Sequence, residues 1–128
     1  YDTYECADGK WISIGSIEPQ FYALLRDKLD LTDDRRFDAQ MDKTQWPVLK
    51  EALTTLFKSQ SRDHWTALME GTDICFGPIL SMAEALVHPH NVERKTFVKL
   101  DGVDQPAPAP RFTGTPAPMP VTRRQAKI

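Results

Sequence analysis

Cysteine is scarce in this chain, which holds two thiols in 128 residues, Cys6 and Cys75. A small secreted scaffold would carry more cysteines, because a small core needs several disulfides to hold the fold. We therefore expect two reduced, partly buried thiols. Metal-binding patterns are missing as well: His88 and His90 flank Pro89, but no third ligand stands at the spacing that a zinc site needs. The sequence predicts no bound metal.

The chain also lacks long hydrophobic runs and an excess of charge of either sign. No apolar run approaches the ~20 residues that cross a bilayer, and the formal net charge is -2. A charge so close to zero gives no electrostatic attraction to nucleic acid or to an anionic membrane. A glycine-rich phosphate loop and a Gly-x-Ser-x-Gly nucleophile elbow are absent too. We therefore expect neither nucleic acid nor a membrane as a partner.

The composition is that of a globular domain, but the C-terminal stretch is rich in proline. Hydrophobic residues make up 41% and charged residues 27% of the chain, and 128 residues suffice for one domain with a modest core. Six of the ten prolines fall between Pro106 and Pro120. Proline has a fixed φ and no N–H donor, so this stretch cannot form a helix or a central strand. We therefore predict a small domain over residues 1–105 and an extended, proline-rich tail over residues 106–128.

Strand and turn signals open the chain. Aromatic and polar residues alternate over residues 1–6, Asp8-Gly9 is a hairpin turn signal, and residues 10–16 supply the returning strand. Two later stretches are also extended: residues 74–80, which Pro78 restricts to a sheet edge or to a strand outside the ladder, and residues 96–103, which predict a second hairpin.

Four helices are predicted around these strands. Each has a start signal: Pro19 in a first turn, Thr44 and Ser61 as N-caps, and the capping-box spacing of Ser81 and Glu84. Gly71 fits a C-terminal stop for the third helix, and Pro89 is expected to end the fourth. The polar residues 30–43 predict a charged, solvated loop. Hairpins, helices and an extended tail together indicate a small α+β domain.

Glu18 stands at the junction between the first hairpin and the first helix, which is expected to run from about Pro19 to Leu29. A carboxylate in that place gains from the helix dipole and from the free N–H groups of the first turn. On composition alone, a solvated first-turn acid is the simpler interpretation of Glu18. The junction is nevertheless the most informative stretch, because a wider pattern is centred on it.

The residues on both sides of Glu18 carry a resemblance that extends along most of the chain. The runs Tyr4-Glu5-Cys6-Ala7-Asp8-Gly9-Lys10-Trp11 and Gly15-Ser16-Ile17-Glu18-Pro19-Gln20-Phe21-Tyr22 resemble the small-domain segment of α-methylacyl-CoA racemases, which belong to the family III CoA-transferase superfamily. Further matches follow in order: Trp46-Pro47, Gly71-Thr72-Asp73, Pro78-Ile79-Leu80, His88-Pro89-His90-Asn91 and Pro106 through Phe112. The resemblance covers residues 1–116.

The resemblance implies a parent enzyme that epimerises 2-methylacyl-CoA thioesters at the α-carbon. It implies two-base proton transfer through an enolate, by a histidine and an aspartate that lie in a larger domain outside this chain. Glu18 matches the glutamate that hydrogen-bonds this histidine, and is the candidate for the catalytic site. Ile17 and Pro19 flank it and would shape the wall beside the acyl chain. Tyr1 matches a position close to the substrate, although a strand aromatic that packs on the domain remains its alternative role.

The resemblance also implies an acyl-CoA substrate, no cofactor, and an interlocked homodimer in which the small domain of one subunit covers the large domain of the other. Glu18 would then act across the interface, and we expect it to be exposed and unpaired in this chain alone. A cytoplasmic parent is expected, or a mitochondrial or peroxisomal one in a eukaryote. The chain begins at Tyr1 inside a strand-like pattern, which predicts a segment of a longer protein. We expect this segment to be inactive by itself, because the resemblance places the partners of Glu18 outside it.

Two other functions stay open. A family III CoA transferase would exchange CoA between an acyl-CoA and a carboxylic acid, using an aspartate nucleophile that also lies outside this chain. The run Glu18-Pro19-Gln20 is the racemase-like feature that separates the two activities. A non-catalytic interaction domain would instead offer its hairpin face to a partner.

Overall fold

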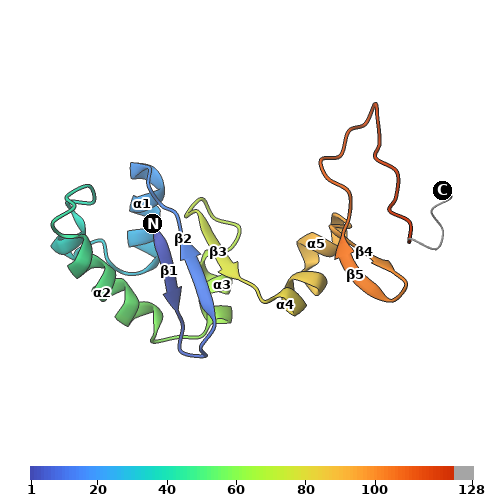
Figure 1. Ribbon diagram of the computed structural model, residues 1–128. Coiled ribbons are helices and arrows are strands. Elements are labelled where there is room, and N and C mark those ends of the chain that lie inside the picture. The colour runs from blue at the N-terminus through green and yellow to red at the C-terminus, as the bar shows by residue number, and fades with distance from the viewer. Residues whose placement is uncertain (123–128) are drawn as a thin grey trace. The chain divides into compact units, whose positions relative to one another are not determined.

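The computed structural model describes residues 1–122, and the chain divides into two compact units, residues 1–79 and residues 80–128. Within the described residues, the first unit contains a three-stranded sheet and three α-helices, and the second contains a two-stranded sheet and two short helices (Figure 1). The α+β class predicted from the sequence is confirmed. None of the helices in residues 1–122 has both the length and the apolar character that crossing a membrane requires.

The sheet of the first unit is antiparallel, with the strand order β1-β2-β3. Its strands are β1 (Asp2–Glu5), β2 (Trp11–Ile14) and β3 (Phe76–Ile79). The first two form the predicted hairpin, whose turn residue Gly9 has a φ of 74°, a conformation that glycine adopts without steric cost. β3 pairs with β2 and places Pro78 opposite Ile12 on an edge strand. The prediction that Pro78 lies at a sheet edge is confirmed.

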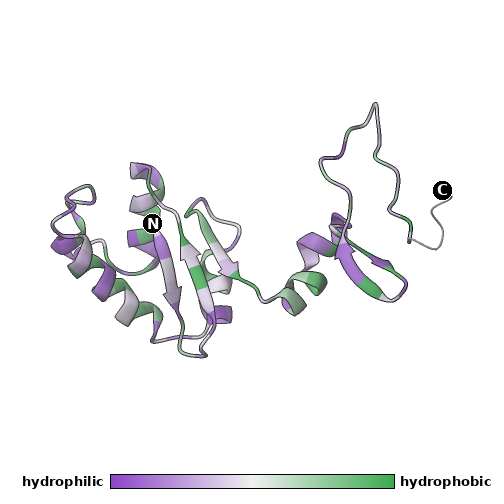
Figure 2. Cartoon of the chain, viewed as in Figure 1, coloured by the Kyte–Doolittle hydropathy of each residue, from purple (hydrophilic) through white to green (hydrophobic). Residues whose placement is uncertain are grey.

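One face of this sheet is buried in the core of the first unit. Tyr4, Ile12 and Ile14 alternate with less buried residues along β1 and β2, and they join a core that includes residues of all three helices. Phe57 is fully buried, and its ring centroid lies 5.0 Å from that of Tyr4 and 5.2 Å from that of Trp65. Figure 2 shows hydrophobic positions along β2 and β3 and hydrophilic positions along α1 and α2. The buried face of the sheet is therefore part of the core of the first unit.

The helices of the first unit are α1 (Pro19–Lys28), α2 (Trp46–Phe57) and α3 (Arg62–Met69). Ser61 caps α3 as predicted, because its hydroxyl accepts the His64 N–H at 3.2 Å. Gly71 follows the end of α3 with a φ of 76°, which confirms the predicted helix stop.

The predicted cap at Thr44 is wrong. The N-cap of α2 is Gln45, and it makes no side-chain bond to the helix. The Thr44 hydroxyl instead donates to Asp42 Oδ1 at 2.7 Å, and the Thr44 N–H donates to the same oxygen at 3.0 Å. Thr44 therefore belongs to a turn that the Asp42 carboxylate closes, and this turn competes with the cap for the hydroxyl.

The second unit holds two short helices, α4 (Met82–Val87) and α5 (Pro89–Glu93), and a hairpin of β4 (Phe97–Leu100) and β5 (Val103–Pro106). The capping box predicted at Ser81 and Glu84 is present. Pro89 does follow the end of α4, but it also opens α5, a helix that the sequence did not predict. Residues 107–122 form neither helix nor strand, and residues 123–128 of the predicted tail lie outside the described residues.

Candidate functional site

Glu18 is the N-cap of α1, in the corner where the chain leaves β2 and turns into the helix. We call residues 15–19 the Glu18 corner. The backbone of Glu18 is extended, with φ -67° and ψ 144°, and its carbonyl accepts the Tyr22 N–H at 3.0 Å. Its carboxylate is exposed and makes no hydrogen bond or ion pair with any of residues 1–122. Glu18 is therefore exposed and unpaired among residues 1–122, as expected from the sequence.

The other three candidate residues lie in the Glu18 corner or beside it. Ile17 and Pro19 flank Glu18, and both side chains are exposed. Tyr1 precedes β1, and its ring lies beside Gly15: a Cβ on Gly15 would lie 3.6 Å from Tyr1 Cε2. The Tyr1 side chain is 89% exposed, so it is not part of the core. All four residues are thus exposed, and Tyr1 lies beside Gly15, the first residue of the Glu18 corner.

Two hydrogen bonds to the segment before β3 hold one side of the Glu18 corner. The Gly15 N–H donates to the Cys75 carbonyl at 2.9 Å, and the Ser16 hydroxyl donates to the Ile74 carbonyl. Ser16 is buried and Ile74 is fully buried, so this second bond is shielded from water. The corner is therefore attached to the core of the first unit.

The side-chain amide of Gln40 holds the other side of the corner. Its Nε2 lies 3.0 Å from the carbonyl oxygen of Ser16 and 3.0 Å from that of Ile17. Gln40 is itself held in place, because the Trp46 indole N–H donates to the Gln40 carbonyl at 2.9 Å. Sequence reasoning missed Gln40, which stands in the polar residues 30–43 and has no local signal that separates it from its neighbours.

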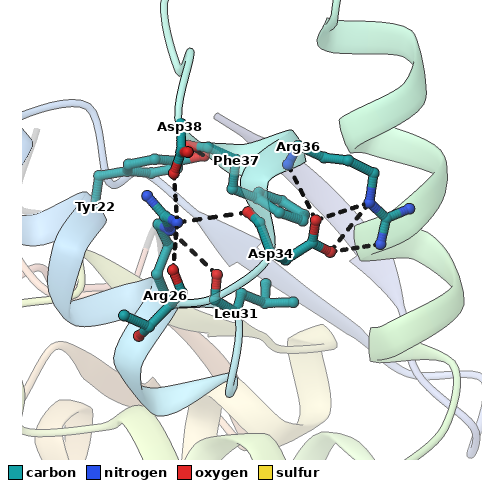
Figure 3. Close-up of polar contacts among 8 residues, drawn as sticks. Tyr22, Arg26, Leu31, Asp34, Arg36, Phe37 and Asp38 are labelled. Atoms are coloured by element: carbon teal, nitrogen blue, oxygen red, sulfur yellow. Dashed lines mark hydrogen bonds and ion pairs between the residues drawn. The ribbon is translucent and has the colours of Figure 1, made fainter.

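The loop that carries Gln40 is an ordered segment tied to α1 (Figure 3). The Arg26 guanidinium donates to three backbone carbonyls and one carboxylate: Leu31 O at 3.3 Å, Thr32 O at 2.7 Å, Asp34 O at 3.5 Å and Asp38 Oδ1 at 2.9 Å. The Tyr22 hydroxyl donates to the Phe37 carbonyl at 3.1 Å, and the Phe37 ring is buried. Most charged side chains of the loop are exposed as expected. The backbone of the loop, however, is held by Tyr22 and Arg26 of α1, the helix that begins after Glu18.

The protonation states of Tyr22 in α1 and of Asp34 in the loop both favour the hydrogen bonds that these residues make. Burial raises the pKa of Tyr22, so its hydroxyl stays protonated at neutral pH and remains a donor to Phe37. The Arg36 guanidinium, 2.6 Å from Asp34 Oδ2, lowers the pKa of the Asp34 carboxyl. The ionised Asp34 also accepts the Arg36 N–H at 3.1 Å and so begins the 3-10 turn Arg35–Phe37.

The two thiols differ from the expectation that both are partly buried. Both are free, but Cys6 is fully buried and Cys75 is exposed. Cys6 follows Tyr4 on the inward side of the first strand, while Cys75 has a φ of 60° between the buried Ile74 and β3. Among residues 1–122, no three His, Cys, Asp or Glu side chains are grouped so that they could hold a metal ion.

Comparison with known proteins identifies the class to which this fold and corner belong. The chain matches CoA-transferase family III over residues 1–127, and it belongs to that family. It is 39% identical over 130 positions to the α-methylacyl-CoA racemase of Mus musculus, covering 100% of this chain and 33% of the mouse protein. It is also 39% identical over 118 positions to the α-methylacyl-CoA racemase of Homo sapiens, covering 91% of this chain and 31% of the human protein. The chain therefore spans about a third of the length of these curated relatives.

A solved structure shares the fold at much lower sequence identity. The crystal structure of Rv3272 from M. tuberculosis superposes with a TM-score of 0.71 over 94% of this chain and 35% of that chain, at 17% identity. A similarity at that identity concerns the fold and not the activity.

Proposed function

We propose that this chain is the C-terminal part of an α-methylacyl-CoA racemase, which epimerises 2-methylacyl-CoA thioesters at the α-carbon. The observation that carries the proposal is the 39% identity to the mouse racemase along the whole chain. A second, local observation supports it: Glu18 presents an unpaired carboxylate on a corner that the fold holds from two sides. An acid whose backbone is held in this way, and which has no partner among residues 1–122, is suited to a partner from another domain or subunit.

Racemisation beside a thioester needs a base on one face of the α-carbon, an acid on the other, and stabilisation of the enolate between them. In the proposed parent, a histidine and an aspartate of the larger domain make the two proton transfers. Glu18 accepts a hydrogen bond from that histidine. The bond fixes the tautomer of the imidazole and favours the imidazolium that forms when the histidine takes the α-proton. We propose no metal or redox cofactor for this step.

The proposed partner of Glu18 belongs to a second subunit. Among the described residues, none of the three histidines bonds to Glu18. We therefore propose an interlocked homodimer in which this segment covers the large domain of the other subunit, with Tyr1, Ile17 and Pro19 beside the acyl group. The proposed setting is the metabolism of branched fatty acyl-CoA thioesters, in the cytoplasm or, in a eukaryote, in mitochondria or peroxisomes.

Deuterium exchange in the full-length parent tests this function. With one epimer of a 2-methylacyl-CoA in D2O, the wild-type enzyme should place deuterium at the α-carbon and interconvert the epimers. Glu18→Gln keeps the size of the side chain but removes its charge, and should lower kcat by about 10²-fold to 10⁴-fold. Glu51→Gln, at another exposed acid, is the matched control and should keep wild-type kcat. A wild-type enzyme that exchanges no α-proton would contradict the proposal.

The 128-residue chain gives a second test of the same proposal. Because the histidine and the aspartate belong to the larger domain, we expect the chain by itself to exchange no α-proton. Exchange by the chain alone would show that the two bases are not where the proposal puts them.

The second candidate function is transfer of CoA from an acyl-CoA to a free carboxylic acid, because the family that the chain matches is named for CoA transfer. Such an enzyme forms an acyl anhydride on an aspartate, which would also lie outside this chain. Full-length parent supplied with an acyl-CoA and an isotopically labelled free acid separates the two activities. CoA found on the labelled acid, without deuterium at the α-carbon, would favour the transferase.

A further inference from the structure

The backbone that precedes Glu18 sets the direction in which its side chain leaves the main chain, along the Cα–Cβ bond. The carboxylate makes no hydrogen bond or ion pair with any of residues 1–122, so none of these residues orients it directly. The two peptide planes before Glu18 contain the carbonyls of Ser16 and Ile17. Because a peptide is planar, fixing these two carbonyls limits the orientation of the Glu18 N–Cα bond, and with it the direction of Cβ.

Both carbonyls are held by one side chain. Gln40 Nε2 lies 3.0 Å from the oxygen of Ser16 and 3.0 Å from that of Ile17. Both acceptors are carbonyl oxygens, so only the amide nitrogen, with its two N–H groups, can occupy this place. The amide thus uses both of its donors on the Glu18 corner. A glutamate or a methionine at the same position could not make this pair of bonds at neutral pH.

Gln40 can act as a brace because its own backbone is anchored on both sides. Toward the N-terminus, Arg26 and Tyr22 of α1 hold four carbonyls, those of Leu31, Thr32, Asp34 and Phe37. Toward the C-terminus, the Trp46 indole at the start of α2 donates to the Gln40 carbonyl at 2.9 Å. The loop therefore leaves α1, is tied to it twice, and returns to the corner from which α1 begins.

We propose that Gln40 is a positioning residue for the active site, acting through Glu18. It holds the Ser16–Ile17–Glu18 backbone so that the Glu18 carboxylate points at the imidazole that it is to orient. This inference rests on the proposed function for its catalytic consequence, but not for its structural one. A loss of the brace leaves the carboxylate present but less well aimed, and a small misplacement of a catalytic group lowers kcat strongly while it changes substrate binding little.

The kinetic test uses Gln40→Met in the full-length parent, since methionine has a similar length but neither donor nor charge. We expect kcat for α-proton exchange to fall by about tenfold to 100-fold, with KM within about twofold of wild type. Gln45→Met is the matched control, because the Gln45 amide is exposed and lies only near Thr44 Oγ1, at 3.5 Å. It should keep wild-type kcat. A Gln40→Met enzyme with wild-type kcat would overturn the inference.

A double variant separates positioning from a general loss of structure. If Gln40 acts through Glu18, the variant Glu18→Gln/Gln40→Met should be no more than about twofold slower than Glu18→Gln. If Gln40→Met slows the Glu18→Gln enzyme by the same factor as it slows wild type, the two residues act independently and the inference is wrong.

A third measurement does not depend on activity and distinguishes failure of this inference from failure of the proposed function. Hydrogen exchange followed by mass spectrometry should show faster exchange in the peptide that spans residues 15–22 for Gln40→Met, and unchanged exchange there for Gln45→Met. If wild-type parent shows no racemase activity but this difference in exchange is found, the proposed function fails and the brace stands. Equal exchange in the two variants would overturn the brace whatever the activity.

Discussion

Tyr4 carries a titratable hydroxyl into the core of the first unit. Its side chain is 4% exposed, and its ring packs against Phe57. Burial, with a smaller contribution from the negative charge of Asp2, raises the pKa of Tyr4 from 10.0 to about 12. Between these two values the unfolded chain has lost the proton and the folded chain still binds it. Stability should therefore be unaffected by Tyr4 below pH 10 and should fall as the pH rises from 10 to 12.

We expect this residue to reduce the free energy of unfolding by about 1.4 kcal/mol per pH unit in that range, and by about 3 kcal/mol in total. Urea unfolding of the chain at a series of pH values measures the slope. Tyr4→Phe keeps the ring and removes the hydroxyl, so it should remove this part of the slope. Tyr1→Phe, at an exposed ring, is the control and should leave the slope as in wild type. Identical slopes in Tyr4→Phe and wild type would contradict the role of Tyr4.

Glu18 could be predicted from the sequence, whereas Gln40, which holds the Glu18 corner, could not. Glu18 was found because a strand-to-helix junction has local signals, a hairpin before it and Pro19 after it. Gln40 was not found because its function is a contact made 23 and 24 residues away, and one polar residue in a polar loop carries no periodicity. Exposure of Glu18 was predictable, whereas the bonds that hold its backbone were not.

At the scale of elements, one arginine makes most of the side-chain bonds that tie the segment between α1 and α2 to α1 (Figure 3). The Arg26 side chain is 17% exposed and donates to the backbone of Leu31, Thr32 and Asp34 and to the Asp38 carboxylate. Its ion pair with Asp38 is largely solvated and contributes little by itself. The bonds to backbone carbonyls matter more, since they fix the path of a loop that has no strand or α-helix of its own.

Arg26→Met keeps most of the aliphatic stem and removes all of these donors. We expect it to lower the free energy of unfolding by about 1–3 kcal/mol and to speed hydrogen exchange in residues 31–40. Arg35→Met is the matched control, because the Arg35 side chain is exposed and makes no hydrogen bond or ion pair among the described residues. It should change stability by less than about 0.5 kcal/mol. Equal losses for the two variants would show that the guanidinium of Arg26 is not the clamp.

Element starts were predictable where the capping residue has no competing partner. Ser61 and Ser81 cap their helices as their sequence spacing predicts. Thr44 does not, because Asp42 two residues earlier accepts both its N–H and its hydroxyl. Pro89 follows the end of α4 and is also the first residue of α5. A proline is compatible with both positions, and the sequence analysis predicted only the first.

At the scale of the whole molecule, the buried side chains are unevenly divided. Every residue that is buried among residues 1–122 lies in the first unit, from Tyr4 to Ile74. The second unit has half-buried side chains at most within the part of the chain that the structure describes. The class of the fold could be predicted from hairpin and helix signals, but this division could not, because it depends on contacts between residues far apart in the sequence.

Burial of apolar surface is the main force that opposes chain entropy, so the first unit should be the part of the chain that folds cooperatively. A chain ending at Ser81 contains the whole first unit, including the carbonyl of Ile79 that accepts a bond from the buried Arg62 at 2.7 Å. We expect its thermal unfolding, followed by circular dichroism, to be a single transition within about 8 °C of the 128-residue chain, a shift that corresponds to about 1 kcal/mol. Residues 80–128 expressed by themselves should show no cooperative transition, because a two-stranded sheet without a buried core is marginally stable in water. A cooperative transition in residues 80–128, or its absence in the chain ending at Ser81, would show that the stability of this protein does not reside in the core around Phe57.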